Sequence, residues 1–170
     1  VQMEFGIRAA SVPAVMRVDQ RVNAALKLGA EAIGAGITIT NSGMDLPCHQ
    51  NKRLGELYLQ NAREILGEDR VENVFGDHRG SSTDCGDVAS LLPLIHPYLG
   101  GFTGLPHAND FDVVDEYAAY VVPAKIAAAT VIDLLSDDAA LAKEIVASYE
   151  PAFASKDAYL AYASSLFSEK

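Results

Sequence analysis

Hydrophobic and polar positions follow two different spacings in the first part of this chain. Met3–Ala10 has the partial alternation typical of a strand. From Val12 to Ala35 apolar residues recur every three or four positions, which predicts a helix, and Ser11 is a suitable N-cap. Ile37 and Ile39 then alternate with threonines, which predicts a second strand. We therefore expect a β-α-β unit at the start of the chain.

The turn-rich stretch Asn41–Pro47 is the best internal boundary. After it, the spacing and cap residues predict a helix that begins after Asn51 and ends at Gly67, a helix with Pro123 in its first turn, a helix capped by Asp137 or Asp138 that runs to about Ser148, and a last helix capped by Ser155. Two short buried strands are predicted at Val71–Phe75 and Leu91–Tyr98. Because strands alternate with helices, the predicted fold class is α/β.

Composition and charge exclude several classes of protein. The chain has 13 basic and 23 acidic residues, a net charge of −10, which argues against nucleic acid or an anionic membrane surface as partner. It contains no run of 18 apolar residues and no secretory signal, so we expect no membrane span and a cytoplasmic location. Two cysteines outside a Cys-x-x-Cys pair do not form a disulfide framework.

The segment from Gly80 to Phe111 contains most of the candidate chemistry. A Gly-Ser-Ser-Thr-Asp turn at Gly80–Asp84 leads into the apolar run Val88–Ile95, and a glycine-rich loop then precedes His107. Flexible backbone beside hydroxyls, an acid and an imidazole is suited to gripping a polar substrate and offering a metal one nitrogen ligand.

The order of these motifs resembles the C-terminal signature of the dinuclear zinc amidohydrolases, a family that includes aminoacylases, glutamate carboxypeptidases and aminobenzoyl-glutamate hydrolases. The matching motifs are Gly80-Ser81-Ser82-Thr83-Asp84, Gly86-Asp87-Val88, Pro93-x-Ile95-His96-Pro97 and then His107. Ile7-Arg8-Ala9, followed by the capped helix, is similar to the aminobenzoyl-glutamate hydrolase branch.

The resemblance implies a fold and a site. Residues 1–42 would be the second half of an α+β lid and dimerisation domain, and residues 43–170 the C-terminal half of a catalytic domain with a mixed sheet flanked by helices. His107 would be the last ligand of a site for two divalent metals, zinc or manganese. The whole enzyme would be a homodimer that hydrolyses N-acyl amino acids, aminobenzoyl-glutamate or small dipeptides through a metal-bridged water.

The other ligands of that family are missing from this sequence. The chain has no His-x-Asp or Cys-x-His motif and no adjacent pair of glutamates. We therefore expect a C-terminal fragment that contains no catalytic residue of its own. Because one imidazole does not hold a dinuclear centre, the fragment should bind zinc weakly and hydrolyse nothing by itself.

Several roles stay open at this stage. Gly80, Ser81, Ser82, Thr83 and Asp84 either hold a substrate carboxylate and orient the loop or form a purely structural turn. His96 is either a half-buried structural histidine or a residue that supports the ligands, whereas His49 and His78 are expected to be solvated. Two alternatives to the hydrolase are a non-catalytic interaction module built on the β-α-β segment and a thiol hydrolase that uses Cys85 and His96.

Overall fold

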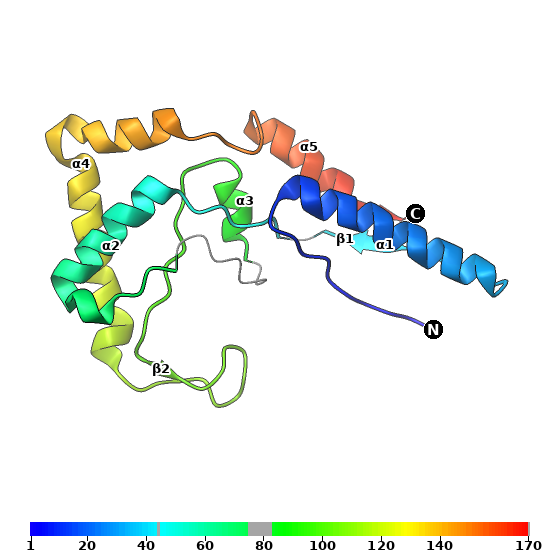
Figure 1. The fold of residues 1–170 in the computed structure, drawn as a ribbon, viewed down its shortest axis with the longest axis horizontal. Coiled ribbons are helices and arrows are strands. Elements are labelled where there is room, and N and C mark those ends of the chain that lie inside the picture. The colour runs from blue at the N-terminus through cyan, green and yellow to red at the C-terminus, as the bar shows by residue number, and fades with distance from the viewer. Residues whose placement is uncertain (44, 75–82, 170) are drawn as a thin grey trace. The chain divides into compact units, whose positions relative to one another are not determined.

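The computed structural model describes residues 1–43, 45–74 and 83–169, and these residues are mostly helical. They belong to two compact units. Figure 1 shows the helices and strands along the chain. Unit 1 comprises Val1–His49, Asp77–Leu92 and Glu150–Lys170; unit 2 comprises Gln50–Gly76 and Pro93–Tyr149. Each unit is thus assembled from segments that are far apart in the sequence.

In unit 1 the long helix α1 (Val12–Ala32) confirms the helical spacing of the first segment. Ser11 is extended and occupies the N-cap position, although its side chain makes no capping hydrogen bond, and Pro13 stands in the first turn. At the other end the backbone N–H of Gly34 donates to the Glu31 carbonyl at 2.9 Å, with Gly34 at a positive φ. Gly34 therefore helps to end the helix just before Ala35, the last residue of the predicted helical spacing.

The predicted β-α-β unit is wrong. Met3–Ala10 forms no strand, and the only strand before α2 in the described residues is β1 (Thr40–Ser42). β1 pairs antiparallel with β4 (Phe167–Glu169) at the other end of the chain. Apolar alternation in Met3–Ala10 is not sufficient for a strand, because a strand also needs a neighbour to satisfy its backbone N–H and C=O groups.

Unit 1 is completed by α3 (Cys85–Ala89) and α5 (Lys156–Leu166). The Ser155 hydroxyl accepts a hydrogen bond from the Ala158 backbone N–H at 3.1 Å, which confirms the predicted N-cap of α5. The backbone N–H of Ala152 donates to the carbonyl of the buried Ser90 at 2.9 Å, so the segment before α5 is tied to the end of α3.

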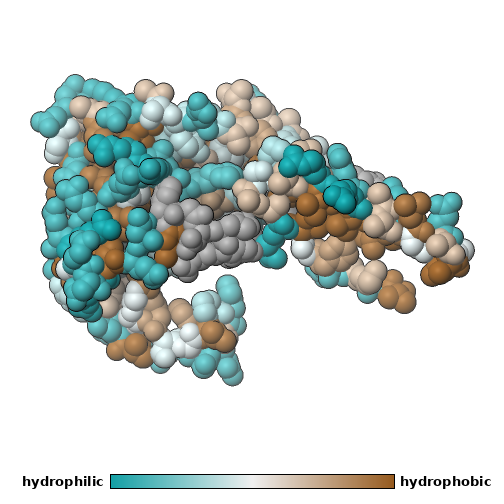
Figure 2. Space-filling model, viewed as in Figure 1, coloured by the Kyte–Doolittle hydropathy of each residue, from teal (hydrophilic) through white to brown (hydrophobic). Residues whose placement is uncertain are grey.

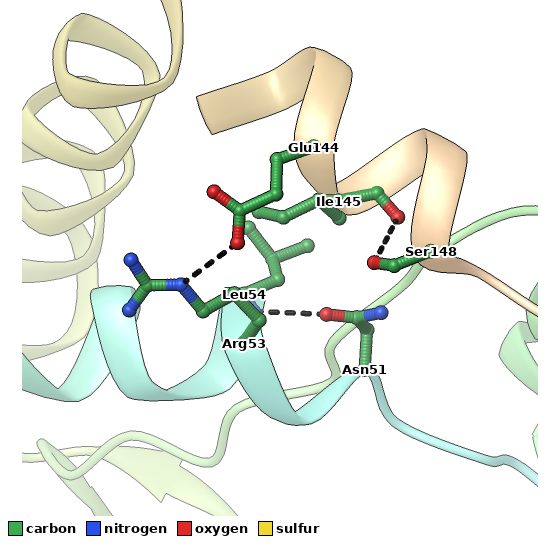
Figure 3. Close-up of polar contacts among 6 residues, drawn as sticks. All are labelled: Asn51, Arg53, Leu54, Glu144, Ile145 and Ser148. Carbon is green, nitrogen blue, oxygen red and sulfur yellow. Dashed lines mark hydrogen bonds and ion pairs between the residues drawn. The ribbon is translucent and has the colours of Figure 1, made fainter. Parts of the chain in front are cut away.

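In unit 2 the helix α2 (Lys52–Leu66) begins and ends where the sequence predicts. The Asn51 side-chain oxygen accepts from the Leu54 backbone N–H at 2.9 Å (Figure 3), and Gly67 ends the helix at a φ of 94°. The short 3-10 turn η1 (Glu68–Arg70) follows. Figure 3 also shows Arg53 of α2 paired with Glu144 of α4 at 3.8 Å, an exposed ion pair of the kind that contributes little to stability.

The π-helical turn η2 (Tyr117–Val121) leads directly into α4 (Val122–Ser148), with Pro123 in the first turn as predicted. α4 is not continuous: Asp137, Asp138 and Ala139 all have positive φ values between 52° and 58°. This break lies where the sequence predicts that one helix stops and a capped helix begins. The second half of α4 therefore corresponds to the predicted separate helix to Ser148.

The packed core of unit 2 forms where α2 and α4 lie side by side (Figure 1). Ile126 is fully buried, together with Ala62 and Val122, and partly buried Tyr58, Leu66, Val71 and Leu99 pack against them. These apolar contacts are the main source of stability of this unit.

The predicted α/β class with a mixed sheet is contradicted by this helical structure. Val71–Val74 and Leu91–Tyr98 form no strands, and Phe75 lies outside the described residues. The remaining strands described are β2 (Phe102–Thr103) and β3 (Asp112–Val113), which pair only with each other. Short apolar runs are ambiguous between strand and other buried structure, and the sequence offers no periodicity that separates the two.

The helical stretch Tyr117–Ser148 is long and apolar enough to cross a membrane by length and composition, a property that a search for 18 uninterrupted apolar residues does not detect. One such helix is weak evidence for a span. Its buried face, centred on Ile126, packs in the unit 2 core, and the break at Asp137–Ala139 interrupts its backbone. Only 22% of its most apolar window is buried within the described structure, so the rest of this apolar surface is exposed.

Asn61 provides a polar contact between α2 and α4, and its removal should destabilise unit 2. The side chain is buried and donates to the Asp133 carboxylate at 2.8 Å and to the Leu57 carbonyl at 3.2 Å. Asn61→Ala leaves the carboxylate without this donor, so we expect a loss of about 1–3 kcal/mol in urea unfolding. Gln60→Ala, which removes the exposed amide next to it, should change the unfolding free energy by less than about 0.5 kcal/mol.

Candidate functional site

The loop that contains His107 joins the paired strands β2 and β3 of unit 2. Gly101 (φ 99°) and Gly104 (φ 76°) shape its base. A Cβ on Gly101 would lie 2.6 Å from the Ala119 backbone nitrogen, and one on Gly104 would lie 2.6 Å from the Asp110 carbonyl carbon. Only glycine fits both the conformation and the close backbone approach at these positions. The glycine-rich stretch therefore sets the path of the loop.

His107 lies in the turn between the two strands with its side chain exposed. Its φ of 67° is in the left-handed region, which is uncommon for a residue other than glycine. Within the described part of the chain, the imidazole has no hydrogen-bond partner. Both ring nitrogens are therefore open to a group that approaches from outside the loop.

The loop and the strands at its base also contain exposed apolar side chains. Phe102 and Phe111 stack with ring centroids 5.2 Å apart, and Leu105 and Val114 are 71% and 66% exposed. Several exposed apolar side chains on one loop are typical of a surface that another protein segment covers.

His107 alone does not form a metal centre. Among residues 1–43, 45–74 and 83–169 no group of three or more His, Cys, Asp or Glu side chains is placed to hold a metal ion. A catalytic zinc site uses about three protein ligands. The donors present in the described residues thus do not fit the dinuclear centre that the sequence resemblance implies, although His107 is available as one ligand.

The proposed substrate-binding or loop-orienting turn is only partly described. Gly80, Ser81 and Ser82 lie outside the described residues, as does His78. The Thr83 hydroxyl donates to the Asp84 carboxylate at 3.1 Å and accepts from the Cys85 backbone N–H at 3.4 Å. These two contacts fit an orienting role at the start of α3, and the substrate-binding role stays a prediction.

His96 is half-buried in unit 2. Its backbone N–H donates to the Gln50 side chain at 2.8 Å, and its ring meets the Tyr98 ring edge-on at a centroid distance of 5.3 Å. The ring thus packs against Tyr98, which fits the structural role considered above. His49 is exposed.

Neither cysteine forms a disulfide, and both are half-buried. Burial, and to a smaller extent the neighbouring Cys85, raises the pKa of the Cys48 thiol. A raised pKa disfavours the thiolate, which is the nucleophilic form. Cys48 is therefore a poor nucleophile, and the thiol hydrolase based on Cys85 stays a hypothesis.

A polar cluster in unit 1 escaped the sequence interpretation. The Tyr159 hydroxyl of α5 donates to the Asp87 carboxylate of α3 at 3.0 Å. Tyr162, one turn further along α5, has a buried hydroxyl with no hydrogen-bond partner in the described structure. The sequence contained one signal for this cluster: two tyrosines three positions apart place two hydroxyls on one helix face.

No protein-family model matches this chain, and no curated protein and no solved structure matches it either.

Alkaline pH should destabilise the folded chain. Burial is the largest cause that raises the pKa values of Cys48, Tyr58, Tyr159 and Tyr162 above their ordinary values of 9.0 and 10.0. The folded chain therefore keeps these protons at pH values where the unfolded chain loses them. The stability that these four protonated groups contribute is fully present below about pH 9 and is lost as pH rises through their folded pKa values.

The test is urea unfolding at pH 7 and at about pH 10.5, just above the ordinary tyrosine pKa. We expect a lower urea midpoint at the higher pH, and a smaller drop for Tyr162→Phe, which has one fewer of these groups. Equal urea midpoints at both pH values would contradict the raised pKa values of these cysteine and tyrosine side chains.

Proposed function

We propose that this chain is the C-terminal part of a metal-dependent amidohydrolase that cleaves the amide bond of N-acyl amino acids, aminobenzoyl-glutamate or small dipeptides. The observation that carries the proposal is the presentation of His107. This residue stands at the position of the last metal ligand in the ordered series of motifs, and its exposed side chain lies at a turn in a left-handed backbone conformation.

The backbone conformation of His107 supports a functional role. A non-glycine residue in the left-handed region costs about 1–3 kcal/mol, and such residues cluster at functional sites. Gly101 and Gly104 flank Phe102 and Thr103, and both have positive φ values. Glycine loses more conformational entropy on folding than any other residue, so holding this turn in one conformation costs free energy. Such a loop presents one imidazole in a defined place.

The apolar rim of the loop supports a site that is completed by another segment. Leu105, Phe111 and Val114 are exposed on the same loop or directly after the strand that follows it. In the proposed enzyme, the segment that supplies the remaining ligands and the catalytic glutamate covers these side chains. The two metals, zinc or manganese, are held mainly by that segment, and the whole enzyme is a homodimer.

The decisive experiment uses the gene that encodes this sequence. We expect an upstream reading frame with a His-x-Asp or Cys-x-His motif and a Glu-Glu pair, and we expect the complete product to hydrolyse N-acyl amino acids and to contain zinc or manganese. His107→Ala in that product should lower both turnover and metal content, because the loss of a ligand opens the coordination sphere.

The matched control is His49→Ala, which removes an exposed histidine of unit 1 and should leave turnover and metal content unchanged. Wild-type turnover and metal content in His107→Ala would overturn the ligand assignment. An upstream frame without those motifs would overturn the whole proposal.

The 170-residue chain by itself gives an independent test. Because it offers one expected ligand, a zinc titration followed by calorimetry should show only weak binding, and acyl-amino-acid hydrolysis should be absent. Near-stoichiometric tight zinc or a chelator-sensitive amidase activity in this chain would contradict the proposal.

A non-catalytic interaction module is the second candidate, and the surface of α1 favours it. Met16, Val18 and Leu28 are exposed along this helix, and Figure 2 shows brown apolar side chains along it. Exposed apolar side chains on a helix offer contact area to another protein segment whether or not the chain belongs to an enzyme. Met16 and Val18 are two positions apart and therefore lie on different sides of α1. The activity of the complete gene product distinguishes the two candidates.

A further inference from the structure

Unit 1 contains a small pocket of about 150 Å³ between α3, α5 and the segment around β1. Its lining combines an apolar part with three polar side chains from two helices. The residues that line it are Gly43, Leu46, Asp87, Tyr159, Tyr162, Ala163, Leu166 and Phe167. A cavity of this size accommodates one small organic molecule, since an engineered cavity of similar volume takes up benzene.

The polar groups of the pocket are only partly satisfied. Asp87 accepts one hydrogen bond from the Tyr159 hydroxyl at 3.0 Å, which leaves capacity on its second carboxylate oxygen. The Tyr162 hydroxyl is buried and has no partner among the described residues. A buried hydroxyl without a hydrogen bond destabilises the folded chain. A ligand that forms the missing hydrogen bond removes this penalty, which favours binding.

The charge of the pocket selects the kind of ligand. Besides burial, the negative charges of Asp19 and Asp87 raise the pKa of Tyr162, so both carboxylates act on this hydroxyl. Negative potential excludes an anion and favours a cation. Tyr159, Tyr162 and Phe167 also line the pocket, and aromatic rings attract cations.

We propose that this pocket binds a small primary ammonium group with a short apolar stem, with Asp87 and the Tyr162 hydroxyl oxygen as acceptors of its N–H groups. The stem lies against Leu46, Ala163 and Leu166. A primary ammonium carries three donors, which matches two acceptors and the solvent at the mouth of the pocket. This binding site is separate from the His107 loop and does not depend on the hydrolase proposal.

The experiment is a titration of the isotope-labelled 170-residue chain with n-butylammonium, followed by amide chemical shifts in NMR spectra. We expect saturable shifts of residues that line the pocket, with a dissociation constant on the order of millimolar for so small a ligand. n-Butanol, of the same length but neutral, should bind at least about tenfold more weakly, and butyrate should not bind.

Two variants test the acceptors. Asp87→Asn keeps the shape but removes the charge and should weaken n-butylammonium binding about tenfold or more. Tyr162→Phe should also weaken binding, while the free protein becomes no less stable, because the unpartnered hydroxyl is gone. Asp157→Asn is the matched control: it removes an exposed charge from the first turn of the same α5 and should leave binding unchanged.

The absence of saturable shifts with n-butylammonium overturns the proposal, as does equal binding of n-butanol. Unchanged affinity in both Asp87→Asn and Tyr162→Phe also overturns it. If Asp87→Asn loses its native amide spectrum, the Tyr162→Phe result alone decides.

Discussion

Ile126→Ala is expected to lower the unfolding free energy of unit 2 by about 2–5 kcal/mol, the usual cost of emptying a buried isoleucine site. The side chain is fully buried at the centre of the core and packs with Ala62 of α2 and Val122 of its own helix. The substitution removes apolar contacts and leaves a cavity, and the surrounding side chains can relax only partly to fill it. Urea unfolding followed by hydrogen exchange of unit 2 amides measures this loss.

The control for this prediction is Ile132→Ala. It makes the same chemical change on the same helix, but Ile132 is 65% exposed. Its removal should change the unfolding free energy by less than about 0.5 kcal/mol. Similar losses for the two variants would mean that the packing of α4 against α2 is wrong.

The helices of this protein were largely predictable because their ends have local chemical causes. Asn51 caps α2 with a side-chain hydrogen bond, Ser155 does the same for α5, and Gly67 ends α2 at a positive φ. These contacts span only a few residues, so the sequence contains both partners. The break inside α4 lies at Asp137 as the sequence predicts, but no capping hydrogen bond of Asp137 or Asp138 accompanies it in the described structure.

The strands were not predictable, because pairing depends on segments that are distant in the sequence. β1 pairs with β4, whose residues come more than a hundred positions later, and no local pattern names that partner. Met3–Ala10 has a similar apolar pattern and remains without a partner strand in the described structure. The predicted mixed sheet failed for this reason.

The candidate site was predictable only in its residue types. The isolated position of His107 after a glycine-rich stretch suggested an accessible histidine, and the structure places it exposed at a turn. Its left-handed backbone had no sequence signal. The pocket in unit 1 was missed because Asp87 and Tyr159 are 72 positions apart, and only folding brings them together.

Gly86→Ala is expected to destabilise unit 1 by at least about 1–3 kcal/mol, the usual cost of overpacking a buried site. Gly86 is buried in α3, and a Cβ there would lie 2.6 Å from the Leu46 carbonyl carbon and 3.1 Å from the Pro47 carbonyl carbon. The atoms it meets belong to the backbone, which cannot swing aside as a flexible side chain does. Because Leu46 is also buried, the segment must move away from α3, and the walls of the Asp87 pocket move with it.

Gly29→Ala provides a control of opposite sign. Gly29 lies inside the exposed part of α1, and no atom is within 4 Å of a Cβ placed there. Alanine should therefore stabilise the helix by about 0.5–1 kcal/mol through its better helix propensity. We expect the urea midpoint to fall for Gly86→Ala and to rise for Gly29→Ala. This pair of results would show that Gly86 is required by close backbone packing, and that the chain does not reject alanine at every glycine. If Gly86→Ala is as stable as the unchanged chain, α3 does not pack on Leu46, and the pocket beside it does not have the walls described above.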